Sequence, residues 1–150
     1  SFLAYFPHGI GMDFSRDIPL GSEARRETIV TRELTVNHAY ASLPEVYATP
    51  HMIYLMEMAA ADAIGDLLPQ GWGSVGTLVD IRHIAATPVD MKVNVHAQVV
   101  EISRTSVRFY CEATDEIEII GRGFHERAIV PLNKFMTRVQ QKSSGLGDKQ

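Results

Sequence analysis

The chain has few of the features that mark secreted, membrane and nucleic-acid-binding proteins. It has one cysteine, Cys111, in 150 residues, which excludes an internal disulfide framework. No apolar run approaches the ~18 residues of a membrane span, and residues 1–10 lack the basic and apolar regions of a signal peptide. The net charge of −4 predicts no basic surface for nucleic acid. We therefore expect a cytoplasmic protein that binds neither nucleic acid nor membrane.

Motifs for metal and nucleotide chemistry are also missing from the sequence. The histidines fall at no known metal-ligand spacing, and there is no HExxH motif and no Cys/His cluster. The sequence contains no P-loop, no dinucleotide-binding glycine motif and no GxSxG motif. We therefore expect no metal and no cofactor.

The chain does have enough apolar sequence for one substantial domain. Hydrophobic residues make up 45% of the 150 residues, and a chain of this length usually folds as one unit. The patterns predict an N-terminal extension over residues 1–27, a domain over 28–142 and a flexible Ser/Gly-rich tail over 143–150. Because glycine and proline break any period in the extension, we expect it to pack on the domain surface or against a partner chain.

A long helix is the clearest predicted element. Thr49 fits the N-cap position and Pro50 the first helical position, where the missing N–H costs nothing. Apolar residues then recur at helical spacing from Met52 to Leu67. The sequence Leu68-Pro69-Gln70-Gly71 ends the helix.

Elsewhere the apolar pattern has a period of two, which is typical of strands. It predicts strands near 28–36, 75–84, 91–99, 107–113 and 118–130. Short turns between the later strands indicate an antiparallel meander. A short helix over 132–142 should turn Phe135, Met136 and Val139 inward. One long helix against one antiparallel sheet is an α+β architecture.

Three side chains on the long helix and the following strand suit acyl chemistry. Glu57 lies on an apolar flank of the predicted helix, where a poorly solvated carboxylate suits a base or nucleophile. It could instead lie at the edge of the helix's apolar face and point into water. His83 could orient water or accept a proton, or be a core histidine bonded to a backbone carbonyl. Thr49 could only cap the helix, although free N–H groups at a helix start also suit an oxyanion. Together these three groups can activate water or form an acyl intermediate, so we interpret the chain as an enzyme acting on an acyl thioester.

Two further residues could contact a ligand. Gly76 would allow close backbone approach, although turn flexibility is the simpler explanation. Arg127, late in the last predicted strand, could hold a phosphate or be an exposed strand arginine.

Five segments resemble those of the hot-dog-fold thioesterases of the fluoroacetyl-CoA thioesterase type. They occur in the family's order and are Leu43–Thr49, Leu55–Glu57, Gly76–Thr77, His83–Pro88 and Gly123–Ala128. The resemblance covers residues 28–142. It implies a hot-dog fold, in which a five-stranded antiparallel sheet wraps a long central helix. It also implies a homodimer that binds acyl-CoA at the subunit interface.

The resemblance further implies roles for individual residues. The family's catalytic Thr, Glu and His fall on Thr49, Glu57 and His83, and its substrate-contacting Gly and Arg fall on Gly76 and Arg127. In the fluoroacetyl-specific member two phenylalanines form a lid over the acyl group. The matching positions here are Tyr40 and Leu43, so we expect no strong preference for fluoroacetyl-CoA over acetyl-CoA.

The function that follows is hydrolysis of a small or medium acyl-CoA to the free acid and CoA. A hot-dog dehydratase or hydratase is one alternative, and a non-catalytic acyl-CoA-binding module is another. The dehydratase class uses a His with an Asp or Glu and lacks the helix-starting Thr. Thr49 therefore favours hydrolysis.

Overall fold

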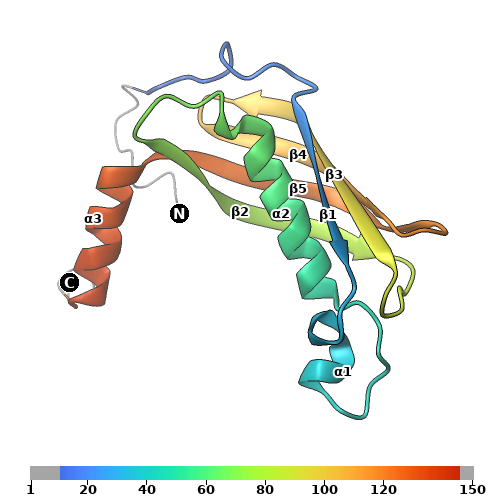
Figure 1. The fold of residues 1–150 in the computed structure, drawn as a ribbon. Coiled ribbons are helices and arrows are strands. Elements are labelled where there is room, and N and C mark those ends of the chain that lie inside the picture. The colour runs from blue at the N-terminus through green and yellow to red at the C-terminus, as the bar shows by residue number, and fades with distance from the viewer. Residues whose placement is uncertain (1–10, 146–150) are drawn as a thin grey trace.

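The computed structural model describes residues 11–145 and consists of one sheet curved around one long helix (Figure 1). The sheet has five strands in the order β1-β3-β4-β5-β2, and all neighbouring pairs are antiparallel. The strands are β1 (Glu23–Ile29), β2 (Trp72–His83), β3 (Lys92–Ser103), β4 (Ser106–Thr114) and β5 (Ile119–Pro131). The helical elements are η2 (Arg32–Leu34), α1 (Val36–Ala39), α2 (Thr49–Gly65) and α3 (Leu132–Ser143). The predicted α+β architecture is confirmed.

The core lies between α2 and the concave face of the sheet. Every second residue is buried along β4 and along β3 as far as Val99, which fits the predicted period of two. The helix contributes one buried face: Met52, Met56, Ala59, Ala60, Ala63 and Ile64. The alanines of this face let the sheet approach the helix closely. Burying each larger side chain stabilises the fold by about 1.5–3 kcal/mol.

The first predicted strand, near 28–36, is wrong. β1 lies earlier in the chain, and residues 32–39 form η2 and α1 instead. β1 has the sequence EARRETI and no apolar alternation, because it is an edge strand whose register is set by backbone pairing with β3. Charged side chains are common on edge strands, where they prevent further pairing. The predicted boundary at residue 27 therefore falls inside β1.

The described part of the predicted extension, residues 11–22, reaches the core and does more than cover the surface. Phe14 and Ile18 are fully buried. The Phe14 ring packs edge-on against Trp72, with ring centroids 5.2 Å apart. Backbone N–H groups of Phe14 and Gly21 donate to the Arg104 and Val99 carbonyls at 2.9 and 2.8 Å. Residues 1–10 and 146–150, which include most of the predicted tail, lie outside the described residues.

The predicted C-terminal helix is present as α3, but its predicted inward packing is wrong. Met136 and Val139 are 48% and 41% exposed, and Phe135 is half-buried. Figure 1 shows why, because α3 leaves the end of β5 and extends away from the sheet. Met136 and Val139 therefore remain exposed instead of packing on the sheet.

β2 forms the other edge of the sheet and differs in character from β1. It pairs with β5 along its whole length, with a register shift between Gly76 and Leu78. Leu78 and Val79 are 40% and 44% exposed, so this edge presents apolar side chains. No helix in the described part of the chain is long and apolar enough to cross a membrane.

Candidate active site

A hydrogen bond joins the start of α2 to the end of β2. The Thr49 hydroxyl lies 2.8 Å from Nδ1 of His83, the last residue of β2. The predicted N-cap role of Thr49 is wrong: the helix begins at Thr49, and its N-cap is Ala48, which has no capping side chain. Because the hydroxyl caps nothing, it is available to the imidazole. The structure therefore brings together two of the three predicted catalytic residues.

The His83 ring is suited to accept a proton. Burial lowers the pKa of His83 below its ordinary value, and the nearby Ala85 backbone opposes that shift less strongly. The imidazole is therefore neutral at pH 7. Its Nε2 atom is buried and has no hydrogen-bond partner among the described residues. A buried nitrogen without a partner is uncommon in folded proteins, so a ligand or water is expected there.

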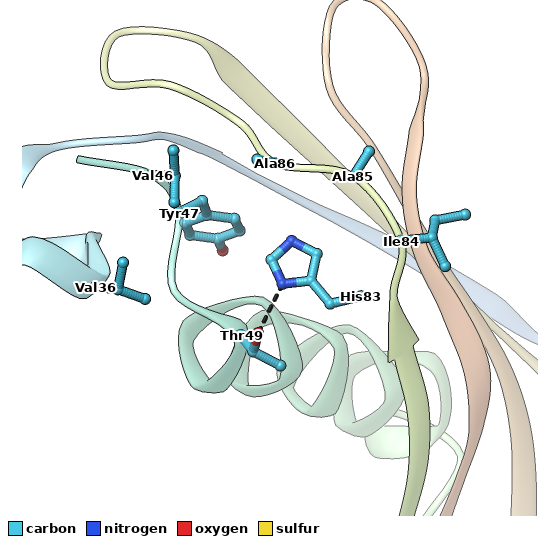
Figure 2. A pocket seen from close by; sticks show the side chains of 8 residues that line it. All are labelled: Val36, Val46, Tyr47, Thr49, His83, Ile84, Ala85 and Ala86. Carbon is cyan, nitrogen blue, oxygen red and sulfur yellow. Dashed lines mark hydrogen bonds between the residues drawn. The ribbon is translucent and has the colours of Figure 1, made fainter. Parts of the chain in front are cut away.

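A pocket of about 340 Å³ opens beside this pair (Figure 2). Its volume falls in the range that small-molecule sites occupy. The walls are mainly apolar, and the lining residues are Val36, Val46, Tyr47, Thr49, His83, Ile84, Ala85 and Ala86. An apolar pocket with a few polar groups at one place suits a short acyl chain whose reactive carbon sits near Thr49.

A second cluster surrounds Gly76 in the middle of β2. Gly76 is paired with Arg127 of β5. A Cβ placed on Gly76 would lie 3.2 Å from His125 Cε1 and 3.6 Å from both Arg127 Nη1 and Glu57 Oε1. The missing side chain therefore leaves a small space bordered by a guanidinium, an imidazole and a carboxylate.

Arg127 is held firmly in this cluster. It is only 6% exposed, so the exposed strand arginine considered above is excluded. Its Nε donates to Ser74 Oγ at 2.8 Å, and its Nη2 donates to the Ser74 carbonyl at 2.9 Å. Burial lowers the pKa of Arg127, and the negative charge of Glu57 partly offsets this.

His125 completes the cluster and was missed from the sequence. Its Nδ1 lies 2.8 Å from the Leu78 carbonyl, which can only accept, so Nδ1 carries the proton. The bare Nε2 then accepts from Arg127 Nη1 at 3.3 Å. Burial, and next the charge of Arg127, lower the pKa of His125 and keep it neutral. The alternation of His125 and Arg127 on one face of β5 was the available signal.

The two clusters are separate within one protomer. Among residues 11–145, Glu57 has no hydrogen-bond or ion-pair partner, and it lies eight residues beyond Thr49, about 12 Å along the helix. Its charge also acts on the buried Cys111, whose pKa is raised to about 12 by burial first and by Glu57 second. The structure therefore joins Thr49 with His83, and Glu57 with Gly76 and Arg127, but does not join these groups to each other.

The predicted lid residues lie outside both clusters. Tyr40 and Leu43 are 66% and 45% exposed and do not line the pocket. Tyr47, from the same connection between α1 and α2, lines it instead. Within residues 11–145, no three His, Cys, Asp or Glu side chains are grouped so that they could hold a metal ion.

Several known proteins resemble this chain in both sequence and fold. A fluoroacetyl-CoA thioesterase of Streptantibioticus cattleyicolor is 36% identical over 130 residues, which cover 83% of this chain and 94% of the relative. A solved structure of the fluoroacetyl-CoA thioesterase FlK matches with a TM-score of 0.78 at 36% identity, over 83% of this chain and 96% of FlK. A thioesterase superfamily member from Thermus thermophilus matches with a TM-score of 0.81 at 33% identity, over 85% and 95% of the two chains.

The sequence model of the fluoroacetyl-CoA-specific thioesterase family matches residues 30–133, which include both clusters. A hot-dog-like protein from Thermanaerovibrio acidaminovorans also matches, with a TM-score of 0.79 at 25% identity. The predicted resemblance and the hot-dog fold are therefore confirmed. This chain belongs to the fluoroacetyl-CoA-specific thioesterase family and is a thioester hydrolase.

Proposed function

We propose that the chain hydrolyses a small or medium acyl-CoA to the free acid and CoA. The observation that carries the proposal is the hydrogen bond between Thr49 and His83 beside a small, mainly apolar pocket. Structures of FlK variants contain acetyl-CoA in one case and fluoroacetate with CoA in another. The pocket volume fits acyl groups of that size and somewhat larger ones.

The chemistry divides among three residues. Thr49 positions the attacking oxygen or carries the acyl group, and His83 accepts its proton and orients water. Glu57 acts as a base or transient nucleophile at the thioester carbonyl. One general acid–base group contributes about 10²–10⁴-fold to the rate. Gly76 and Arg127 contact the substrate, and the burial of Arg127 favours a contact with the acyl end over one with a phosphate.

The proposal is tested by incubating the protein with a panel of short and aromatic acyl-CoAs and a thiol reagent. CoA release that falls at least about 10²-fold in E57Q supports the assignment of Glu57. Asp66→Asn is the matched control, because Asp66 is an exposed carboxylate at the C-cap of the same helix. Binding of acyl-CoA without any release of CoA would refute the hydrolase and indicate a binding module.

We also propose a homodimer paired through β2. The β1 edge has charged side chains, whereas β2 presents Leu78 and Val79, and uncovered edges of this kind tend to pair. A two-fold axis near Val79 and Asp80 would set Gly76 of one protomer opposite His83 of the other. Each complete site would then combine the Thr49–His83 pair with the Glu57 cluster of the other copy.

Mixing two inactive variants tests this arrangement. If T49V and E57Q protomers exchange, each mixed dimer has one site with both substitutions and one site with neither. Random exchange should restore about a quarter of wild-type activity. No recovery, in a mixture shown by native mass spectrometry to contain mixed dimers, would place all three residues in one protomer. A monomer in light scattering at micromolar concentration would refute the dimer.

The segment with Tyr40 and Leu43 is proposed to close over the acyl group. It joins α1 to α2, and the same connection supplies Val46 and Tyr47 to the pocket wall. Neither residue reproduces the paired phenylalanines of the fluoroacetyl-specific relative. The proposed enzyme therefore accepts ordinary acyl-CoAs.

A further inference from the structure

Hydrolysis of a thioester needs a hydrogen-bond donor for the carbonyl oxygen. When a nucleophile adds to the carbonyl carbon, the oxygen gains a negative charge that a positioned donor stabilises. The start of α2 was expected to supply such donors, but most of them are used or missing. Pro50 has no N–H, and the N–H groups of His51 and Met52 both donate to the Ala48 carbonyl, at 3.1 and 3.2 Å. Of the first four helical residues, only Thr49 has an N–H left.

The Tyr47 side chain offers a donor at the same place. Tyr47 is only 2% exposed, lines the pocket with Thr49 and His83, and forms no side-chain hydrogen bond among the described residues. Figure 2 shows its ring across the pocket from His83, with the hydroxyl inside the pocket. The hydroxyl faces the pocket and no other described side chain, so the carbonyl oxygen of a ligand in the pocket can accept its hydrogen bond.

The position and protonation of Tyr47 suit this task. Its backbone N–H donates to the Thr87 carbonyl at 2.8 Å, and it forms a β-bridge with Thr35, so the residue is fixed from two sides. Burial raises the pKa of Tyr47 to about 12. The phenol therefore keeps its proton at neutral pH and remains a donor.

We propose that the Tyr47 hydroxyl donates a hydrogen bond to the thioester carbonyl oxygen as that oxygen becomes negative. This inference rests on the proposed thioesterase activity. As the nucleophile's oxygen bonds to the carbonyl carbon, its proton passes to His83 and the C=O π pair moves to the oxygen that Tyr47 contacts. The electron pair on that oxygen then re-forms the C=O bond and the C–S bond breaks. The CoA thiolate leaves and takes the proton from His83. Tyr47 keeps its own proton throughout.

The test is Tyr47→Phe, which keeps the ring and removes only the hydroxyl. Loss of one donor of this kind lowers kcat by about 10²–10³-fold, and KM should change little because the bond strengthens only in the transition state. Tyr54→Phe is the matched control, because Tyr54 is 60% exposed on α2, and its kcat should equal that of the wild type.

A second variant separates a catalytic donor from a structural hydroxyl. Replacing Tyr47 with 3-fluorotyrosine makes the phenol a stronger donor, so kcat should differ from the wild type while KM and the melting temperature stay the same. Full kcat in Y47F, or a raised KM at unchanged kcat, would overturn the inference and leave the thioesterase proposal standing. Absence of CoA release by the wild type would overturn both.

Discussion

Replacing Thr49 with valine removes the hydroxyl that reaches His83 and changes little else. Thr49 is not the N-cap, so the variant avoids the loss of about 1 kcal/mol that removing a capping side chain brings. It does lose the 2.8 Å hydrogen bond and leaves His83 Nδ1 without a partner. An unsatisfied buried group costs about 1–3 kcal/mol. At about 2–4 °C per kcal/mol for a chain of this size, the melting temperature should fall by about 2–12 °C.

Activity should respond far more strongly than stability to the same change. Breaking a paired nucleophile and base lowers kcat/KM by about 10²–10⁴-fold, whereas Thr49→Ser keeps the hydroxyl and should stay within about tenfold of the wild type. CoA release measured with a thiol reagent gives kcat/KM, and thermal melts of the same preparations give stability. If T49V keeps more than about a third of wild-type kcat/KM while it binds acyl-CoA normally, the Thr49–His83 pair is not the reacting centre.

Three further predictions concern stability, pH and selectivity. A Cβ on Gly123 (φ 156°) would lie 2.1 Å from the Asp80 carbonyl oxygen, so G123A should lower the free energy of unfolding in urea by more than about 3 kcal/mol. The control G71A should lower it by about 1 kcal/mol, because Gly71 has a φ of 88° but a Cβ there would contact nothing. His83 and His125 have pKa values below the ordinary 6.5 in the folded protein. The stability they contribute is therefore present above pH 6.5 and is lost as the pH falls through their folded-state pKa values. The urea midpoint should be lower at pH 5 than at pH 7.5, and this difference should be smaller in an H83Q/H125Q variant. The kcat/KM values for fluoroacetyl-CoA and acetyl-CoA should agree within about tenfold, and a strong preference for the fluorinated substrate would show that Tyr40 and Leu43 form a selective lid.

The sequence predicted the long helix and four of the five strands because their signals are local. Pro50 and the spacing of Met52, Met56, Ala59 and Ala63 identify a helix without reference to any other part of the chain. β1 lacks such a signal, because its charged side chains lie on an edge and its position depends on pairing with β3, about seventy residues later. The wrong inward packing of α3 has a related cause, since its apolar pattern shows which face is apolar but not what covers it.

The candidate site was predicted as a set of residue types, whereas its arrangement depends on long-range contacts. Thr49 and His83 are 34 residues apart in sequence, so capping was the local explanation for a hydroxyl whose actual partner is an imidazole. Tyr47 and His125 lie inside the segments that carry the family resemblance, but only the structure shows their burial and their neighbours.

The separation of Thr49 from Glu57 was already implied by their spacing. Eight residues of α-helix span about 12 Å, which no pair of these side chains can bridge. A helix can therefore present both residues to one substrate only if the substrate is long or if a second copy supplies one of them. β2 holds Gly76 and His83 about 23 Å apart on one edge strand, and antiparallel pairing of two such edges exchanges their ends. The same two-fold operation that covers Leu78 and Val79 would thus bring the carboxylate of one copy to the hydroxyl and imidazole of the other.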